Sequence, residues 1–262
     1  MRKAWGRLAR FLDINSVVVI GRTIRKWVAV TGILAGILVG AGGLSGFSNQ
    51  KDECTILLHG LARTSKSMNV IGRALEREGY QVVNINYPST KYSIEVLADL
   101  AIVRGLKECG EAEGISFVTH SMGGILVRQY LKYQEIENLN RVVMLGPPNQ
   151  GSELIDHIDD FPRFEWVKIE AGRQLGTGQY SLPRLLGEVD FDLGVIAGTK
   201  TTNPITSRFL PDPDDGKVSV ESTRVEGMSD HIELPVSHSF MMRNRTVIRQ
   251  IIYYLSHGEF IR

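Results

Sequence analysis

The sequence predicts an α/β fold, in which a mainly parallel sheet is flanked by helices on both faces. Apolar runs of strand type alternate with segments of helical spacing from residue 54 onward, and this alternation is typical of parallel sheets covered on both sides. The composition is that of a globular domain, with 43% hydrophobic and 23% charged residues in a chain of 262. Such a chain is long enough to bury one large core.

The elements follow one another in order along the chain. Apolar runs that end in glycine or proline predict strands, and apolar residues at helical spacing predict helices. We expect strands over 54–60, 80–88, 115–121, 141–148, 193–199 and 231–236. We expect helices over 65–79, 93–110, 122–134 and 241–256. The stretch 149–190 is rich in Gly, Pro, Asp and aromatic residues, and we expect it to be either a cap insertion or a surface excursion.

The first residues of the chain form a basic head. Residues 1–26 carry seven basic side chains and one acid, a net charge of +6, which leaves −5 for the rest because the total is +1. A basic head on a mildly acidic body does not indicate nucleic-acid binding, which needs its positive charge on the folded surface.

The head is followed by an apolar segment. Residues 27–47 form a run of 21 without a charge, about the length that crosses ~30 Å of hydrocarbon. We expect a single-pass transmembrane anchor or signal anchor, and a cleaved signal peptide is the alternative. The basic residues place 1–26 in the cytoplasm and the domain 51–262 on the extracytoplasmic side of the cell membrane, periplasmic or extracellular.

Both cysteines, Cys54 and Cys109, lie in this domain. Outside the cytoplasm such a pair can be oxidised to a disulfide. Two buried free thiols are the alternative, because the sequence does not show whether the two residues approach each other.

The stretch VTHSMGG, residues 118–124, places Ser121 where an expected strand turns into an expected helix. This arrangement presents a serine hydroxyl as a nucleophile, and the tight turn requires small neighbours. The usual form is G-x-S-x-G; here Gly123 is kept and Thr119 replaces the first glycine. The N–H group of Met122 begins the helix beside the serine. A serine that only caps the helix is the alternative.

A serine nucleophile needs a base, and the base needs an orienting acid. In this arrangement the acid and the histidine follow the serine in chain order. Asp215 precedes Gly216 at an expected turn, and His238 follows the last expected strand. We prefer Asp215 to Asp214 because the glycine lets the chain turn there. A turn aspartate and a surface histidine are the alternatives for each residue alone, and His231 is the second candidate base.

The negative charge that develops on an attacked carbonyl needs two hydrogen-bond donors. The run LLHGL ends the first expected strand, and the loop after that strand supplies one donor in such folds. The N–H group of Leu61 is the candidate, with His59 and Gly60 shaping the turn. We expect His59 and His120 to be structural, and the side chain of His120 to face away from Ser121.

These motifs together resemble those of the α/β-hydrolase superfamily, in particular bacterial triacylglycerol lipases and esterases. The resemblance covers about residues 54–257 and is carried by LLHGL, VTHSMGGILVR, LGPPNQGSE and DDGKVSVEST followed by a histidine. It implies a compact α/β-hydrolase fold. It also implies a triad of Ser121, Asp215 and His238, with an oxyanion hole formed by Leu61 and Met122.

The resemblance does not determine the substrate, because the superfamily also contains thioesterases, acyltransferases and inactive relatives. We expect a membrane-anchored serine hydrolase that cleaves carboxylic esters, with an ester or a lipid as its substrate. An acyltransferase or thioesterase with the same triad, or a non-catalytic domain that binds a lipid or a partner, is the alternative. No cofactor is implied, and the oligomeric state is open. No cluster has zinc spacing, and the acidic run DPDD lacks the full ligand series of a calcium loop.

Overall fold

The computed structural model describes residues 52–157 and 169–262. Within them, six strands form one sheet in the order β2-β1-β3-β4-β5-β6, and every neighbouring pair runs parallel. The strands are β1 (Glu53–Leu58), β2 (Gln81–Ile85), β3 (Gly114–His120), β4 (Leu139–Leu145), β5 (Leu193–Gly198) and β6 (Asp230–Leu234). The predicted parallel sheet is therefore confirmed. All its carboxyl ends meet at one edge, where the loops that follow the strands gather.

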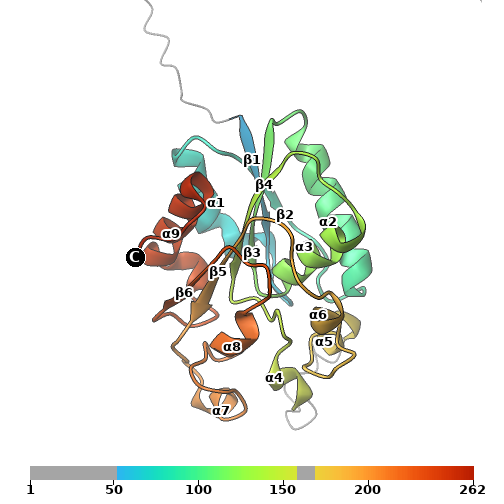
Figure 1. The fold of residues 1–262 in the computed structure, drawn as a ribbon, viewed down its shortest axis with the longest axis vertical. Coiled ribbons are helices and arrows are strands. Elements are labelled where there is room, and N and C mark those ends of the chain that lie inside the picture. Colours follow the sequence, from blue (N-terminus) through green and yellow to red (C-terminus); the bar gives the residue numbers. More distant parts are fainter. Residues whose placement is uncertain (1–51, 158–168) are drawn as a thin grey trace, which may run out of the picture. The chain divides into compact units, whose positions relative to one another are not determined.

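Four longer helices cover the sheet. Figure 1 shows α1 (Asn69–Arg77) and α9 (Arg245–His257) on one face, and α2 (Ile94–Cys109) and α3 (Met122–Tyr133) on the other. Apolar side chains of each strand alternate between the two faces, because successive strand residues point to opposite sides. In β1, Ile56 packs in the cluster that contains α2 and α3, whereas Leu57 packs in the cluster that contains α1 and α9. Both faces are buried, which explains the continuous apolar runs of the strands.

The remaining described elements are short. They are η1 (Ser65–Met68), α4 (Glu153–Asp156), α5 (Glu170–Arg173), α6 (Leu182–Leu185), α7 (Pro204–Ser207), α8 (Val220–Thr223) and η4 (Met241–Arg243). Figure 1 shows α4, α7 and α8 beyond the carboxyl edge of the sheet. The stretch 149–190 thus contains three single-turn helices and the residues 158–168, which lie outside the described ranges. Its role as a cap stays a prediction.

The closing helix begins later than its apolar pattern predicts. We expected it over 241–256, but α9 starts at Arg245 because the side chain of Asn244 accepts hydrogen bonds from the N–H groups of Thr246 (2.9 Å) and Val247 (3.1 Å). An asparagine at this position satisfies N–H groups that have no partner within the helix. The helix ends at His257, and Gly258 after it adopts a left-handed conformation with φ 77°.

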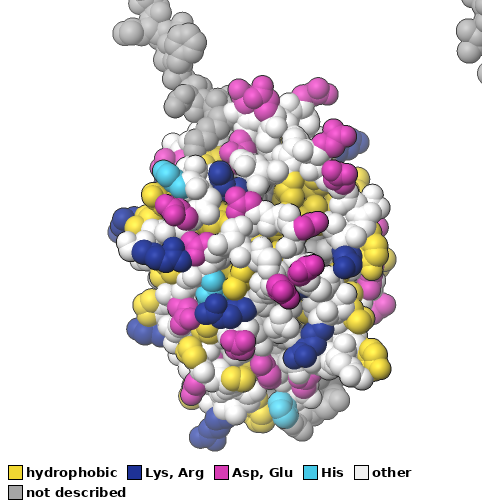
Figure 2. Space-filling model, viewed as in Figure 1, with side chains coloured by type: hydrophobic (Ala, Val, Ile, Leu, Met, Phe, Trp, Pro, Cys, Tyr) yellow, Lys and Arg dark blue, Asp and Glu magenta, His cyan; other side chains and the backbone are white. Residues whose placement is uncertain are grey.

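The described ranges hold no helix that combines the length and the apolar character needed to cross a bilayer. The predicted anchor at 27–47 and the basic head at 1–26 lie outside these ranges. On the face seen in Figure 2, acidic and basic side chains are interspersed. This face shows no extended basic stripe of the kind that follows a nucleic-acid backbone.

Cys54 in β1 and Cys109 at the end of α2 form a disulfide, with their Cα atoms 5.8 Å apart. Both residues are buried. The structure therefore decides between the two alternatives that the sequence left open. The bridge joins the sheet to the helix that covers it, and it closes a loop with a sequence separation of 55.

We predict that loss of this disulfide destabilises the domain. Closing a loop of this length in the unfolded chain is worth about 4 kcal/mol in the chain-entropy model. The double variant Cys54→Ala, Cys109→Ala should lose free energy of unfolding of that order in denaturant titrations of the purified protein. Mass spectrometry of the native wild-type protein without reductant should show a mass lower by two protons. Two thiols that alkylate freely in the native protein would contradict the bridge.

Candidate active site

Ser121 occupies a sharp turn between β3, which ends at His120, and α3, which begins at Met122. Its backbone has φ 56° and ψ −124°, a region that L-residues rarely adopt and that costs of order 1–3 kcal/mol. Ser121 N–H donates to the carbonyl of Leu145 (2.9 Å), and its own carbonyl accepts from Gly124 N–H (3.0 Å). The residue is half-buried and lines a cavity at the carboxyl edge of the sheet. The predicted strand–turn–helix geometry is present.

Two glycines after Ser121 make this turn sterically feasible. A Cβ atom on Gly123 would lie 2.7 Å from the carbonyl oxygen of Leu58, so a side chain there would push α3 away from β1. A Cβ atom on Gly124 would lie 2.8 Å from Met144 Sδ and 3.3 Å from Thr119 Oγ1. Thr119, which stands where the usual motif has glycine, is fully buried. Gly124 therefore leaves room for the side chain of Thr119.

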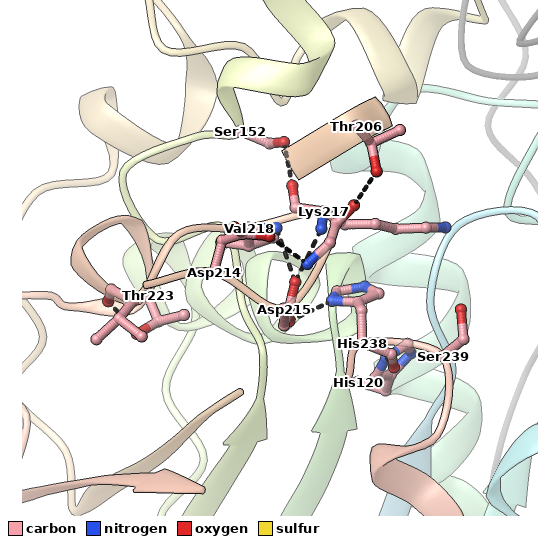
Figure 3. Close-up of polar contacts among 12 residues, drawn as sticks. His120, Ser152, Thr206, Asp214, Asp215, Lys217, Val218, Thr223, His238 and Ser239 are labelled. Carbon is pink, nitrogen blue, oxygen red and sulfur yellow. Dashed lines mark hydrogen bonds and ion pairs between the residues drawn. The ribbon is translucent and has the colours of Figure 1, made fainter. Parts of the chain in front are cut away.

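His238 and Asp215 are in direct contact (Figure 3). His238 Nδ1 lies 2.7 Å from Asp215 Oδ2, and His238 N–H donates to the Asp215 carbonyl (2.9 Å). Asp215 Oδ1 accepts from the N–H groups of Lys217 (3.0 Å) and Val218 (2.8 Å). Because an ionised carboxylate only accepts hydrogen bonds, Nδ1 carries the proton and Nε2 is left as the basic nitrogen. Both side chains are buried, with exposures of 2% for Asp215 and 3% for His238.

Two glycines at strand ends allow this contact, and the sequence analysis did not single them out. Gly146 follows β4 with φ 52°, and a Cβ atom there would lie 2.8 Å from Asp215 Oδ2 and 3.1 Å from His238 Nδ1. Gly198 ends β5, and its Cβ atom would lie 2.8 Å from Asp215 Cβ. Their sequence signal is a glycine directly after an apolar run, at the carboxyl end of a parallel strand.

Asp214 points to different partners. Its Oδ1 accepts from Gly216 N–H (2.6 Å), and its Oδ2 accepts from the hydroxyl of Ser207 in α7. Burial raises the pKa of this carboxyl, although both hydrogen bonds counteract the shift. Asp214 thus ties the turn that carries Asp215 to α7, a larger structural role than the turn pattern alone indicates.

His120 contacts the backbone of His238. Its Nε2–H donates to the carbonyl of His238 (3.0 Å), and the two rings are 4.7 Å apart. The pKa of His120 is lowered well below its usual value, mainly by burial and further by the charge of the neighbouring His238. We expected a structural histidine that faces away from Ser121. The structural contact is present, but the side chain lines the same cavity as Ser121.

His59 and His231 have partners of their own. His59 stacks on Tyr87 with a ring distance of 4.0 Å and contacts the Gly60 carbonyl through Nδ1 (2.9 Å); burial lowers its pKa. His231, the second candidate base, pairs with Thr223 Oγ1 (3.0 Å) and is not among the described residues that line the cavity. Burial lowers the pKa of His231 to about 4.

The two candidate oxyanion donors are the N–H groups of Met122 and Leu61. Met122 is the first residue of α3, and the first N–H groups of a helix have no partner within it; its side chain is buried in the core. Leu61 follows β1 and lines the cavity. A Cβ atom on Gly60 would lie 3.1 Å from Ser121 Cβ, so this loop approaches the serine closely. Ala62 has φ 52°, and its N–H group donates a hydrogen bond to Ser89 Oγ (3.1 Å), which fixes the position of this loop.

The cavity has a volume of about 260 Å³. Ser121, Asp215 and His238 line it, and so do the apolar residues that we call its apolar wall: Pro148, Leu154, Ile155, Leu175 and Val218. In the described part of the chain, no group of three or more His, Cys, Asp or Glu side chains could hold a metal ion.

We predict that exchange of the two neighbouring aspartates has unequal effects. Asp215→Asn should lower kcat for p-nitrophenyl butyrate by about 10⁴-fold, because an amide N–H facing Nδ1 stabilises the wrong imidazole tautomer. Asp214→Asn keeps an acceptor for Gly216 N–H, so kcat should stay near wild type while the free energy of unfolding falls by about 1 kcal/mol. Circular dichroism should show both variants folded. The opposite ranking in kcat would make Asp214 the acid, and full activity in both would exclude this turn from the reaction.

Comparison with known proteins reveals similar folds at low sequence identity. No protein-family model matches the chain, and no curated protein matches it. A mature-form lipase from Bacillus licheniformis matches with a TM-score of 0.64 and 18% identity over 77% of this chain and 91% of that one. The phospholipase PlaB from Legionella pneumophila matches with a TM-score of 0.62 and 17% identity over 79% of this chain and 59% of that one. Lipase B from Aspergillus fumigatus matches with a TM-score of 0.59 and 14% identity over 84% of this chain and 56% of that one. With the parallel sheet and its flanking helices, these likenesses show that the chain has the α/β-hydrolase fold found in bacterial lipases and esterases.

Proposed function

We propose that this protein is a serine hydrolase that cleaves carboxylic esters. The observation that carries the proposal is the strained Ser121, which lines one cavity together with a buried His238–Asp215 pair. Strain of this kind persists only where the surrounding structure enforces it. A domain that merely binds a lipid or a partner gains nothing from it, so this observation favours catalysis over a silent role.

The reaction proceeds through an acyl-enzyme. Ser121 Oγ attacks the acyl carbonyl while His238 Nε2 takes its proton, and Asp215 holds the imidazolium that forms. The N–H groups of Leu61 and Met122 stabilise the oxyanion, each typically worth ~3 kcal/mol of the barrier. His238 then protonates the leaving alcohol. Water then attacks the acyl carbonyl and gives a proton to His238, which passes it to Ser121 Oγ as the acyl–Oγ bond breaks and the carboxylic acid leaves.

The apolar wall of the cavity supports an acyl substrate. Leu154, Leu175 and Val218 line it, and burying apolar area contributes roughly 25 cal/mol per Å². Neighbouring structures named lipase and phospholipase support a lipolytic enzyme at the level of the fold. We propose further that residues 27–47 anchor the enzyme in the cell membrane, with the catalytic domain on the extracytoplasmic side. This rests on the uncharged run and the basic head before it.

We predict that a fluorophosphonate probe labels one serine, Ser121. Ser121→Ala should abolish labelling and p-nitrophenyl butyrate hydrolysis without unfolding the protein, because Ser121 is the cavity-lining serine at the strained turn where α3 begins. Ser67→Ala is the matched control: Ser67 lies on the surface turn η1, where its hydroxyl donates to the Thr64 carbonyl (2.8 Å), and it should label like wild type. Equal labelling of the Ser121→Ala variant would refute the assignment of the nucleophile.

We predict that the full chain behaves as an integral membrane protein. It should sediment with membranes in high salt and dissolve only in detergent, because burial of an apolar segment of this length is not reversed by salt. Protease added from the extracytoplasmic side should digest the catalytic domain. A variant lacking residues 27–47 should leave the membrane fraction. Release of the full chain by salt alone would rule out a spanning anchor.

A further inference from the structure

The loop that follows β2 holds the loop that carries the candidate oxyanion donor Leu61. Tyr87 and Ser89, both in the loop after β2, are only 4% and 3% exposed. A buried hydroxyl group needs a hydrogen-bond partner, and both hydroxyl groups find theirs in residues 59–62, just after β1. Neither residue is among the described residues that line the cavity. Any effect of Tyr87 and Ser89 on the reaction must therefore pass through residues 59–62.

Tyr87 holds His59 by three contacts. The two rings stack at a distance of 4.0 Å with an interplanar angle of 8°. The Tyr87 hydroxyl donates to the His59 carbonyl, and the Tyr87 N–H group donates to His59 Nε2 (3.4 Å). Burial raises the pKa of Tyr87 and lowers the pKa of His59, so the phenol keeps its proton and the imidazole stays neutral. Because Nε2 accepts a hydrogen bond, the proton of this ring is on Nδ1.

His59 in turn orients the peptide group that carries the candidate donor. Its Nδ1–H group donates to the Gly60 carbonyl (2.9 Å), which also accepts from Arg63 N–H (3.3 Å). The Gly60 carbonyl and the Leu61 N–H group belong to one planar trans peptide, so they point in opposite directions. Fixing the carbonyl therefore fixes the direction of the N–H group. Among the described residues, none accepts a hydrogen bond from Leu61 N–H.

Ser89 fixes the chain on the other side of Leu61. Its Oγ accepts from the N–H group of Ala62 (3.1 Å), whose backbone has φ 52°. This conformation is costly for a residue with a side chain and persists only where the surroundings enforce it. Ser89 N–H donates to the Tyr87 carbonyl (2.9 Å), so the two residues form one turn. This turn holds the chain both before and after Leu61.

We propose that Tyr87 and Ser89 are positioning residues for the oxyanion hole, which hold the Leu61 N–H group where negative charge develops on the substrate. The inference rests on the proposed function, because an oxyanion hole has a role only if the ester is cleaved. A donor fixed in advance stabilises the transition state more than the bound substrate. Loss of either contact should therefore lower kcat and leave KM unchanged, whereas a purely structural role would change stability alone.

Two variants of the full chain in detergent test this role with p-nitrophenyl butyrate. Tyr87→Phe keeps the ring stack on His59 and removes only the hydroxyl that binds the His59 carbonyl. We expect kcat to fall roughly tenfold at unchanged KM, because complete loss of an oxyanion donor costs about 10²–10³ in kcat and a displaced donor costs less. Ser89→Ala, which leaves Ala62 N–H without its acceptor, should lower kcat several-fold in the same way.

Butylboronic acid provides a second measurement on the same variants. Ser121 Oγ adds to boron, its proton passes to His238, and one oxygen of the tetrahedral adduct takes the position of the oxyanion. Such an adduct mimics the transition state. Its inhibition constant should therefore rise in each variant by the factor by which kcat/KM falls.

Tyr254→Phe is the matched control. Tyr254 in α9 is fully buried, its hydroxyl donates to Asp192, and it is not among the described residues that line the cavity. This variant also loses a buried tyrosine hydrogen bond, so its Tm should fall while kcat and the inhibition constant stay at their wild-type values.

Wild-type kcat in folded Tyr87→Phe and Ser89→Ala overturns the positioning role while ester hydrolysis stands. A rise in KM in place of the fall in kcat, or a fall in kcat without the matching rise in the inhibition constant, overturns it as well. If Tyr87→Phe does not fold, the same measurements on Ser89→Ala decide. Folded wild-type protein that neither hydrolyses the ester nor binds butylboronic acid overturns the proposed function itself.

Discussion

His238 Nδ1 lies 2.7 Å from Asp215 Oδ2, and much of the structure around the cavity keeps these two buried atoms together. The two residues come from loops after different strands, so the contact exists only because β5 and β6 are in parallel register. Gly146 provides the space for it, since any side chain there would displace the carboxylate. Asp214 ties the acid-bearing turn to α7, and His120 holds the backbone of the histidine. A buried pair of this kind costs desolvation, and it persists because His238 Nδ1 and both carboxylate oxygens of Asp215 have hydrogen-bond partners.

The serine depends on a different constraint, which is close approach of the backbone. α3 packs directly against the end of β1 because Gly123 has no side chain, and the Leu61 loop reaches Ser121 because Gly60 has none. The strained backbone of Ser121 is therefore held by packing on two sides and by its hydrogen bond to Leu145. Rigid placement of this kind suits catalysis, because donors fixed in advance need no reorganisation when charge develops on the substrate.

Under the proposed function, the lining of the cavity bears on the choice of substrate more than Ser121, Asp215 and His238 do. Many unrelated activities share the α/β-hydrolase fold and its catalytic residues, so specificity resides in the residues that line the rest of the site. Here Leu154 and Leu175 give the lining an apolar part that fits the acyl chain of the proposed ester substrate. The bridge between Cys54 and Cys109 lies in the core of the domain and stabilises the scaffold without contributing to the cavity lining.

The sequence by itself determined the order of strands and helices, the parallel sheet and the turn at Ser121, because these depend on apolar periodicity and on residues that are neighbours in the chain. The expected chain order of serine, acid and histidine, together with local patterns, also predicted Asp215 and His238 as candidates. Only the tertiary structure decided that Asp215 rather than Asp214 meets the histidine, that His120 supports it, and that the two cysteines pair. Such contacts join residues from different strands and loops. They depend on strand register and on the space that glycines leave, which no local pattern encodes.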